Sequence, residues 1–184
     1  MADELEVKAR IDDPAAVERA LVTAGADLVF RGAMIDRRFD QSGRLESRDE
    51  VLRLRLYRPE GGGPAHGVLG WKGPPSQRGD YRHREELETA VADADAALAV
   101  LDRLGYAVTL RIDRTISQYR LDGAVIRLER YPAMDTLVEV EGPPAAIERA
   151  IAATGVPRDR FLPQSLPYFV AAYERRTGRR AVLA

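Results

Sequence analysis

The first eleven residues alternate between charged and apolar side chains with a period of two. Glu4, Glu6 and Lys8 fall on one face of a strand, and the other face carries Leu5, Val7 and Ala9. Two carboxylates spaced i, i+2 on a strand can converge on one cation, and a lysine two residues on can neutralise an anion held by that cation. The stretch therefore predicts a strand with a functional charged face. An edge strand with a solvated face is the alternative.

Charged faces of the same kind recur on most of the strand-like segments. Their members are Arg53/Arg55, Arg82/Arg84/Glu86/Glu88, Arg127/Glu129 and Glu139/Glu141. Solvated faces usually include threonine, serine, glutamine and lysine, whereas these faces carry almost only arginine and carboxylates. Lys8 and Lys72 are the only lysines in the chain. Because the planar fork of arginine suits phosphate oxygens, the pattern indicates a surface that binds phosphate.

Composition excludes several classes of protein. The 184 residues include 28 basic and 29 acidic side chains, which argues against a general nucleic-acid or membrane-surface protein because these usually have a basic surplus. With no cysteine, any metal must be held by oxygen ligands or by the two histidines, His66 and His83. The length predicts a single domain over residues 1–184, and the absence of an apolar signal region predicts a cytoplasmic location.

Periodicity and turn residues predict four helices and about eight strands. Strands are expected over 1–11, 28–40, 51–57, 67–72, 80–90, 107–119, 124–130 and 136–141, with polar loops over 41–49 and 73–79. Helices are expected over 14–24, 93–104, 166–176 and from Pro143-Pro144 to about Gly155, the first two capped by Asp13 and Asp93. A sheet of this size can close into a barrel with its charged faces inward and helices over its apolar faces. A hydrated lumen would lower the cost of enclosing so many charges.

Several motifs, in this order, resemble those of the CYTH domain, or triphosphate tunnel metalloenzyme superfamily. The family includes class IV adenylyl cyclases, thiamine triphosphatases and inorganic triphosphatases. The matching segments are Glu4-x-Glu6-x-Lys8, Asp36-x-x-Phe39-Asp40, Leu52-Arg53-Leu54-Arg55, Trp71-Lys72-Gly73-Pro74, Arg84-Glu85-Glu86-Leu87-Glu88, Leu104-Gly105-Tyr106 and the Met134–Glu141 segment. They cover nearly the whole chain. The resemblance implies an α+β fold, an eight-stranded antiparallel β-barrel with helices packed on its outside.

The resemblance also implies roles for individual residues. The carboxylates that would hold Mg²⁺ or Mn²⁺ are Glu4, Glu6, Glu129, Glu139 and Glu141. The side chains that would bind phosphate are Lys8, Arg53, Arg55, Lys72, Arg84, Arg114 and Arg127, of which Lys8, Lys72, Arg53 and Arg55 would also act in catalysis. Glu86 and Glu88 would bind metal or pair with an arginine. Two positions depart from the family pattern: Glu129 stands where an aspartate is usual, and Ile116 where a basic residue is usual, so Arg111 or Arg127 would have to compensate.

Motifs shared by the whole superfamily leave the reaction open. The leading prediction is divalent-metal-dependent hydrolysis of a triphosphate such as tripolyphosphate, ATP or thiamine triphosphate. Formation of cyclic AMP and pyrophosphate from ATP is the first alternative, and a non-catalytic module that binds polyphosphate or nucleotide is the second. Among partners, neither nucleic acid nor a membrane is expected, and a homodimer is left open.

Overall fold

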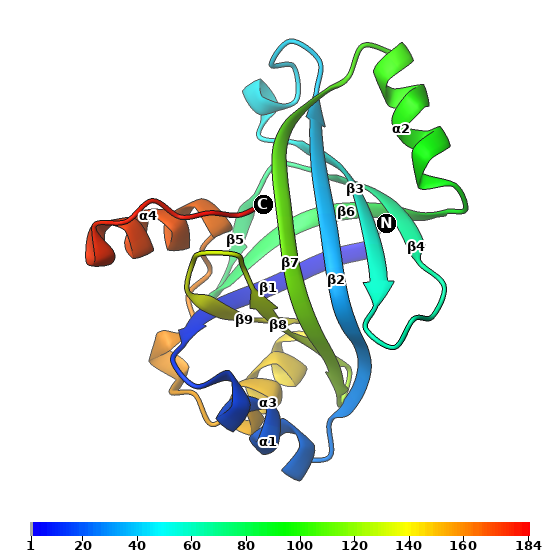
Figure 1. The fold of residues 1–184 in the computed structure, drawn as a ribbon. Helices are drawn as coiled ribbons and strands as arrows, with labels where there is room; N and C mark the ends of the chain where they lie inside the picture. Colours follow the sequence, from blue (N-terminus) through cyan, green and yellow to red (C-terminus); the bar gives the residue numbers. More distant parts are fainter. Residues whose placement is uncertain (1) are drawn as a thin grey trace.

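The computed structural model describes residues 2–184, with side chains described from Leu5 onward. Within this part, the strands are β1 Ala2–Ile11, β2 Asp27–Asp40, β3 Val51–Pro59, β4 His66–Lys72, β5 Ser76–Arg78, β6 Tyr81–Val91, β7 Ala107–Leu121, β8 Ala124–Arg130 and β9 Thr136–Glu141. The sheet order is β1-β9-β8-β7-β2-β3-β4-β6, and β1 pairs with β6 to close a barrel (Figure 1). β5 pairs with β6 outside this ring. The predicted eight-stranded antiparallel barrel is confirmed.

The helices are α1 Pro14–Thr23, α2 Ala94–Arg103, α3 Pro144–Thr154 and α4 Leu166–Thr177. Asp13 and Asp93 cap α1 and α2 as predicted, each accepting a hydrogen bond from the backbone N–H three residues on. Two short 3₁₀ helices, Glu46–Arg48 and Arg158–Arg160, lie in the connections. Figure 1 shows α1 and α3 together on one outer side of the barrel and α2 on the opposite side.

The apolar faces of the strands pack under these helices. Alternate residues of β1, β8 and β9, such as Val7, Ile126 and Val140, form the largest core with α1 and α3. Leu54 of β3 and Phe39 of β2 pack with Leu101 of α2. Burial of these faces against the helices fixes the opposite, charged faces toward the lumen, because a strand sends successive side chains to opposite sides.

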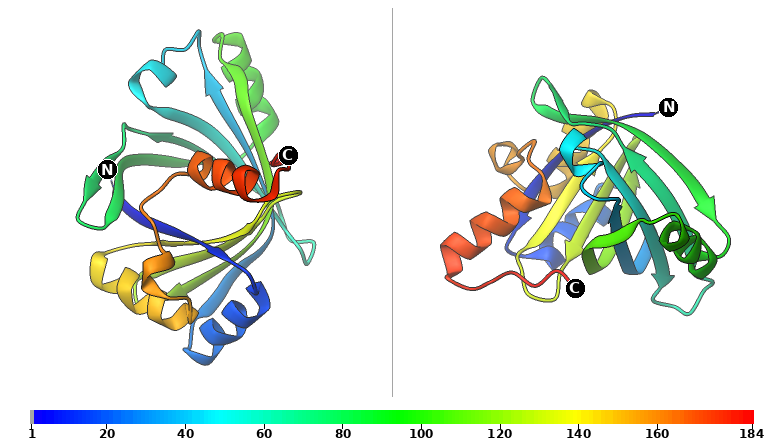
Figure 2. Two further views of the ribbon diagram at one scale, coloured as in Figure 1. Left: turned by 90° about the vertical axis from the view of Figure 1, so that its left-hand side faces the viewer. Right: turned by 90° about the horizontal axis from the view of Figure 1, so that it is seen from above.

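The last helix lies across one open end of the barrel rather than along its wall (Figure 2, left). Leu166 and Phe169 of α4 pack with Ile112 of β7, Leu137 of β9 and Tyr131. These three barrel residues are in phase with the lumen-facing side chains of their strands. The apolar contact therefore forms a cover at this end of the lumen.

Two connections differ from the expectation of plain polar loops. Residues 76–78 form β5, a short exposed strand that adds to the edge of β6, and three polar residues carry too little pattern to show this in the sequence. The loop after β2 is ordered by Asp40, whose carboxylate accepts hydrogen bonds from the backbone N–H groups of Gln41, Leu45 and Glu46. These contacts hold the pKa of Asp40 below its ordinary value.

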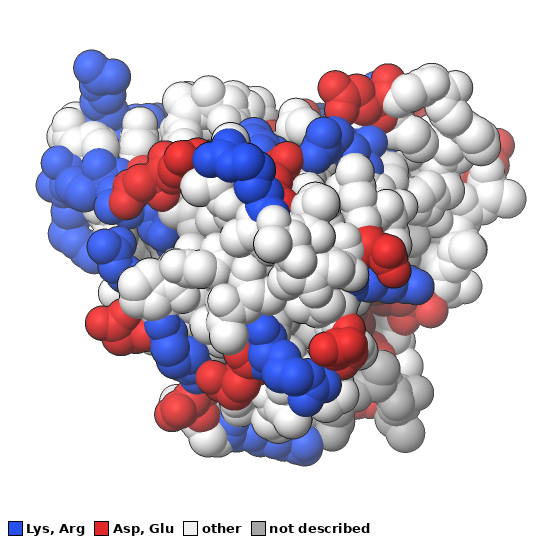
Figure 3. Space-filling model, turned by 90° about the horizontal axis from the view of Figure 1, so that it is seen from below, with Lys and Arg blue, Asp and Glu red and all other residues white. Residues whose placement is uncertain are grey.

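The outer surface carries charges of both signs among apolar groups, as the face in Figure 3 shows. In the part of the chain that is described, no helix has the length and apolar character needed to cross a membrane.

Candidate active site in the barrel lumen

The lumen contains a cavity of about 280 Å³ whose walls are mostly charged. Its basic lining residues are Lys8, Arg38, Arg53, Arg55, Lys72, Arg82, Arg84 and Arg114, and its acidic ones are Glu6, Asp49, Glu129 and Glu139. Pro163, Ser165 and Leu166, which lead into α4, close one side. Nine of the predicted site residues therefore line one cavity, although they come from seven different strands.

A buried lysine lies between two carboxylates on β1 and β9. The Lys8 ammonium is 2.7 Å from Glu6 Oε2 and 2.5 Å from Glu139 Oε2, and all three side chains are less than a tenth exposed. The strand register explains the meeting, because Lys8 stands opposite Glu139. The backbone of Glu4 pairs with Arg84, whereas its predicted metal-binding side chain lies outside the described residues.

This triad shifts the titration of its members. Burial alone would raise the pKa of Glu6, but the charges of Lys8 and Lys72 lower it to about 2. Burial opposes the charged form of Glu139 as well, and Lys8 and Arg127 nonetheless hold its pKa well below the ordinary value. The two carboxylates raise the pKa of Lys8 above its ordinary value against the effect of burial. All three groups are therefore charged near neutral pH.

A second set of ion pairs lies on β3, β4 and β6. Arg53 Nη2 donates to Glu86 Oε1 at 2.5 Å and to Glu88 Oε1 at 3.0 Å, and Lys72 Nζ lies 3.3 Å from Glu86 Oε1. Gly70 makes room for this pair, because a Cβ there would lie 3.2 Å from Glu88 Oε1 and 3.5 Å from Arg53 Nε. Of the two roles predicted for Glu86 and Glu88, the structure provides contacts for pairing with basic side chains.

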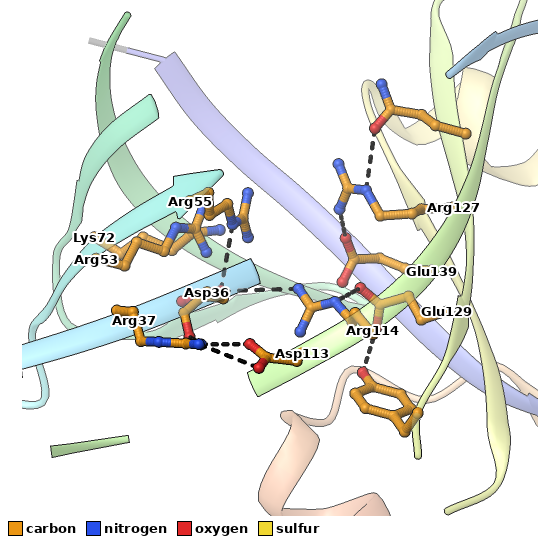
Figure 4. A network of polar contacts seen from close by, with 12 residues as sticks. Asp36, Arg37, Arg53, Arg55, Lys72, Asp113, Arg114, Arg127, Glu129 and Glu139 are labelled. Atoms are coloured by element: carbon orange, nitrogen blue, oxygen red, sulfur yellow. Dashed lines mark hydrogen bonds and ion pairs between the residues drawn. The ribbon is translucent and has the colours of Figure 1, made fainter. Parts of the chain in front are cut away.

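A buried network joins the two walls of the lumen (Figure 4). Asp36 Oδ2 lies 3.4 Å from Arg55 Nε and 3.9 Å from Arg114 Nη2, and Arg114 Nε lies 3.0 Å from Glu129 Oε1. Tyr131 Oη donates to Glu129 Oε2 at 2.6 Å. Burial and the Glu129 charge raise the pKa of Tyr131 well above its ordinary value, so Tyr131 remains a donor.

Two basic residues on the β6 face also have partners in this cavity. Arg84 is buried, and its Nη2 donates to Asp49 Oδ1 at 2.7 Å and to the Asp49 carbonyl at 3.2 Å. Asp49 lies in the loop that Asp40 orders. Arg82, on the same face, donates to Glu6 Oε1 at 2.8 Å.

Two further predicted residues, Arg127 and Glu141, line a second cavity of about 370 Å³, which shares Arg55 with the first. Glu141 and Arg127 lie here, 3.8 Å apart, and Arg127 also pairs with Glu139. This cavity includes an aromatic cluster in which Tyr57 and His66 stack at 4.7 Å with their planes 5° apart, and Phe30 meets Tyr57 edge-on. The structure therefore separates Glu141 from the cavity that Glu6, Glu129 and Glu139 line.

The two departures from the family pattern have different consequences. Glu129 lines the main cavity beside Arg114 and Tyr131. Ile116 is fully buried and contributes no charge. It pairs with Gly32 of β2 on one side and with Glu129 of β8 on the other. Arg111 does not compensate for Ile116, because its side chain is exposed and out of phase with Arg114. Arg127 is buried in the lumen wall and is the one of these two arginines positioned to contribute.

Arg38, Arg82 and Tyr131 line the cavity although they were not predicted as site residues. Arg82 belongs to the predicted charged face of residues 82–88, but the family motif begins at Arg84. Arg38 is two residues from Asp36, so an extension of the period-two pattern from Asp36 would have included it. Tyr131 follows the last residue of β8, and only the packing of α4 against it reveals its position.

The carboxylates of the main cavity provide the ligand type that Mg²⁺ and Mn²⁺ prefer. Glu129 Oε1 is buried and, although it lies near Arg114 Nε, it lacks a hydrogen bond of good geometry. Glu6 and Glu139 already bind a cation, the Lys8 ammonium. Among the described side chains, no three potential ligands converge as they do around a bound ion. The donor set thus fits a hard divalent cation in its chemistry, and a bound ion would replace contacts now made by Lys8 or Arg114.

Comparisons with known proteins agree on the barrel. No protein-family model and no curated protein sequence matches the chain. Among solved structures, a protein from Pyrococcus horikoshii OT3 is 23% identical with a TM-score of 0.73, over 96% of this chain and 99% of that one. A candidate adenylate cyclase from Vibrio parahaemolyticus is 19% identical with a TM-score of 0.75, over 91% and 97%. The chain shares the closed antiparallel barrel fold of these structures.

A third similar structure is a candidate adenylyl cyclase from Hippeastrum, which is said to have a dominant triphosphatase activity. It is 18% identical with a TM-score of 0.64, over 98% of both chains. The barrel fold that the motifs predict is therefore confirmed over nearly the whole chain, while identities this low leave the reaction to be argued from the site itself.

Proposed function

We propose that this protein is a divalent-metal-dependent enzyme that hydrolyses a triphosphate in the barrel lumen. The observation that carries the proposal is the main cavity, where buried lysines and arginines from opposite walls face the same enclosed space. Enclosing so many cations is costly unless an anion joins them. Eight basic against four acidic lining residues leave an excess of positive charge that a triphosphate would offset, and the fixed arginine forks suit its oxygens.

The basic residues would act by binding and orienting the phosphates. Arg53, Arg55 and Lys72 would hold phosphate oxygens from one wall, and Arg114 from the other. Their charges are already in place, so little reorganisation is needed when negative charge shifts during phosphoryl transfer. Lys8 stays protonated, because its two carboxylates raise its pKa, and it would contribute a fixed positive charge at the acidic end.

Glu6, Glu129 and Glu139 would hold Mg²⁺ or Mn²⁺, with Glu4 as the predicted fourth ligand on β1. A bound ion supplies a bridge between phosphate oxygens and neutralises charge at the reacting phosphorus. Glu141 has a smaller part in this proposal, since it lines the second cavity. The Hippeastrum protein, with its stated triphosphatase activity, supports hydrolysis as the leading reaction.

Cyclisation of ATP is the second candidate, and one observation favours it. The Phe30–Tyr57–His66 cluster lines a cavity that adjoins the phosphate-binding one at Arg55. Aromatic side chains offer stacking surfaces to a nucleobase, which inorganic tripolyphosphate lacks. Two of the similar structures are candidate adenylate cyclases, which supports the same reading.

A product assay decides among these functions. Purified protein would be given tripolyphosphate, ATP or thiamine triphosphate with Mg²⁺ or Mn²⁺, and orthophosphate, pyrophosphate and cyclic AMP would be measured. The Glu6→Gln/Glu139→Gln variant is the inactive reference. Glu148→Gln is the matched control, because Glu148 pairs with Arg158 on the outside. Orthophosphate that depends on the two lumen glutamates supports hydrolysis, and cyclic AMP with pyrophosphate supports cyclisation. Metal-independent binding without any product would leave a binding module.

A further inference from the structure

Arg38 of β2 differs from the other basic residues of the lumen in having no anionic contact of its own. It lines the main cavity in phase with Asp36. Within the described part of the chain, its guanidinium makes no hydrogen bond or ion pair, and its Nε is buried without a partner.

The residues directly opposite Arg38 on the two neighbouring strands are positively charged or uncharged. Across β2 and β3 it stands opposite Arg53, and across β2 and β7 it stands opposite Leu110. Like charges directly opposite each other on neighbouring strands destabilise a sheet. Arg53 is compensated by its own contacts with Glu86 and Glu88, so Arg38 is the surplus charge of this pair.

Asp36, two residues before Arg38 on the same strand, is engaged through only one of its carboxylate oxygens, and its Oδ1 is buried without a hydrogen bond. Asp36 Oδ2 lies 3.4 Å from Arg55 and 3.9 Å from Arg114, and the two pairs compete for that oxygen. Burial lowers the pKa of Arg38 to about 10, and the charges of nearby arginines add to this effect against the attraction of Asp36. The ligand-free protein therefore holds a charge that its own side chains do not neutralise.

We propose that Arg38 binds a phosphate group of the substrate in the main cavity. The assignment rests on the proposed function and extends it to a residue that the sequence motifs do not include. A phosphate oxygen in the main cavity would pair with the Arg38 guanidinium and reduce its repulsion with Arg53. The free energy lost by placing these two arginines opposite each other is regained when the anion binds.

A ligand-binding role and a structural role for Arg38 predict opposite changes in stability. If Arg38 supports the fold, its removal lowers the unfolding midpoint of the ligand-free protein. If Arg38 awaits an anion, its removal relieves repulsion, so the ligand-free midpoint stays the same or rises while phosphate binding weakens. The two readouts together separate these roles.

The experiment uses Arg38→Met, Arg38→Lys and the matched control Arg37→Met. Arg37 is the adjacent residue of the same strand and pairs outward with Asp113. Urea unfolding is measured without ligand, and tripolyphosphate binding is measured by calorimetry without divalent metal. We expect Arg38→Met to bind tripolyphosphate roughly tenfold to a hundredfold more weakly, as for loss of a charged hydrogen bond, with no fall in its midpoint. Arg38→Lys should recover part of the affinity, and Arg37→Met should bind as the wild type does.

Two results would overturn the assignment. One is unchanged binding of tripolyphosphate by Arg38→Met, and the other is a lowered unfolding midpoint of ligand-free Arg38→Met. The product assay fails or succeeds separately. If binding of tripolyphosphate depends on Arg38 but no substrate is turned over, the proposed enzymatic function is rejected and the role of Arg38 is kept. If substrate is turned over and neither binding nor KM changes in Arg38→Met, the role of Arg38 is rejected and the enzymatic function is kept. No binding of tripolyphosphate by the wild type would reject both.

Discussion

The two faces of the barrel wall use charged residues in different ways. On the outer face Arg37 pairs with Asp113, and Glu18 of α1 pairs with Arg31 and Arg130; each pair has water within reach. On the inner face the members of each group depend on one another, as in Glu6–Lys8–Glu139, and are almost fully buried. Outer pairs can lose a member and be rehydrated. A buried inner group that loses a member cannot be rehydrated. The charges in the lumen must therefore be compensated by one another or by a bound ligand.

The largest expected effect is on the inner triad. Lys8→Met would leave Glu6 and Glu139 buried without their shared cation, and we expect it to lower the free energy of unfolding by about 3–5 kcal/mol. Urea unfolding at pH 7 without divalent metal measures the change. Mg²⁺ should restore part of the loss in this variant, because the proposed ion would take the place of the ammonium. A loss of unfolding free energy below about 1 kcal/mol in Lys8→Met would contradict the proposed difference between the inner and outer faces.

Two tyrosine–glutamate hydrogen bonds allow the inner and outer faces to be compared with the same donor and acceptor groups. Tyr131 donates to Glu129 at 2.6 Å in the lumen, and Tyr81 donates to Glu148 at 2.7 Å on the outside. Tyr131→Phe should cost about 1–3 kcal/mol, because it leaves a buried carboxylate oxygen unsatisfied. Tyr81→Phe should cost less than about 0.5 kcal/mol, because water replaces the hydroxyl. Thermal unfolding of both variants in one buffer checks the order, and equal losses would contradict it.

The outer network under α1 should have an intermediate effect that depends on pH. Glu18 accepts hydrogen bonds from Arg130 at 2.7 Å and from Ser117 at 3.0 Å. Partial burial opposes the charged form of Glu18. The hydrogen bonds from Arg130 and Ser117, together with the charge of Arg31, nonetheless lower its pKa. A carboxylate whose pKa is lowered in the folded state stabilises the fold at pH values above its ordinary pKa of about 4.3. This stabilisation is lost as the pH falls through the pKa of Glu18 in the folded protein.

Glu18→Gln should therefore cost about 1 kcal/mol at pH 7, and the difference from wild type should shrink as the pH falls below about 4.3. Urea unfolding of both proteins between pH 7 and pH 3 measures this. A difference that is constant over the range would mean that the charge of Glu18 contributes nothing.

The sequence predicts the inner face wherever alternation is regular. Arg53 and Arg55, for example, lie inward because Leu52, Leu54 and Leu56 between them are apolar. Arg38 escapes this reasoning because the run Asp36-Arg37-Arg38 is charged throughout, and a register shift between Arg38 and Phe39 breaks the period. The next two residues, Phe39 and Asp40, are both buried.

The parts of the site that come from tertiary packing were out of reach of the sequence. The position of α4 across the end of the barrel depends on Phe169 meeting residues of β7 and β9, far away in the chain. The separation of Glu141 from Glu139 has a similar origin. Both belong to one charged face of β9, but Glu139 pairs with Lys8, whereas Glu141 lies at the second cavity with Arg127.

The smallest expected effect is on the outer pair next to Arg38. Arg37 Nη2 donates to Asp113 Oδ2 at 3.1 Å, and the side chains are 19% and 39% exposed. A double-mutant cycle of Arg37→Met and Asp113→Asn should give a coupling energy below about 1 kcal/mol that falls further in high salt. The same cycle on Arg114 and Glu129 should give a larger coupling that salt changes little, because both side chains are buried in the lumen. If the two couplings were equal and equally screened, burial in the lumen would not set the inner charges apart, and the reason to assign them to a bound anion would disappear.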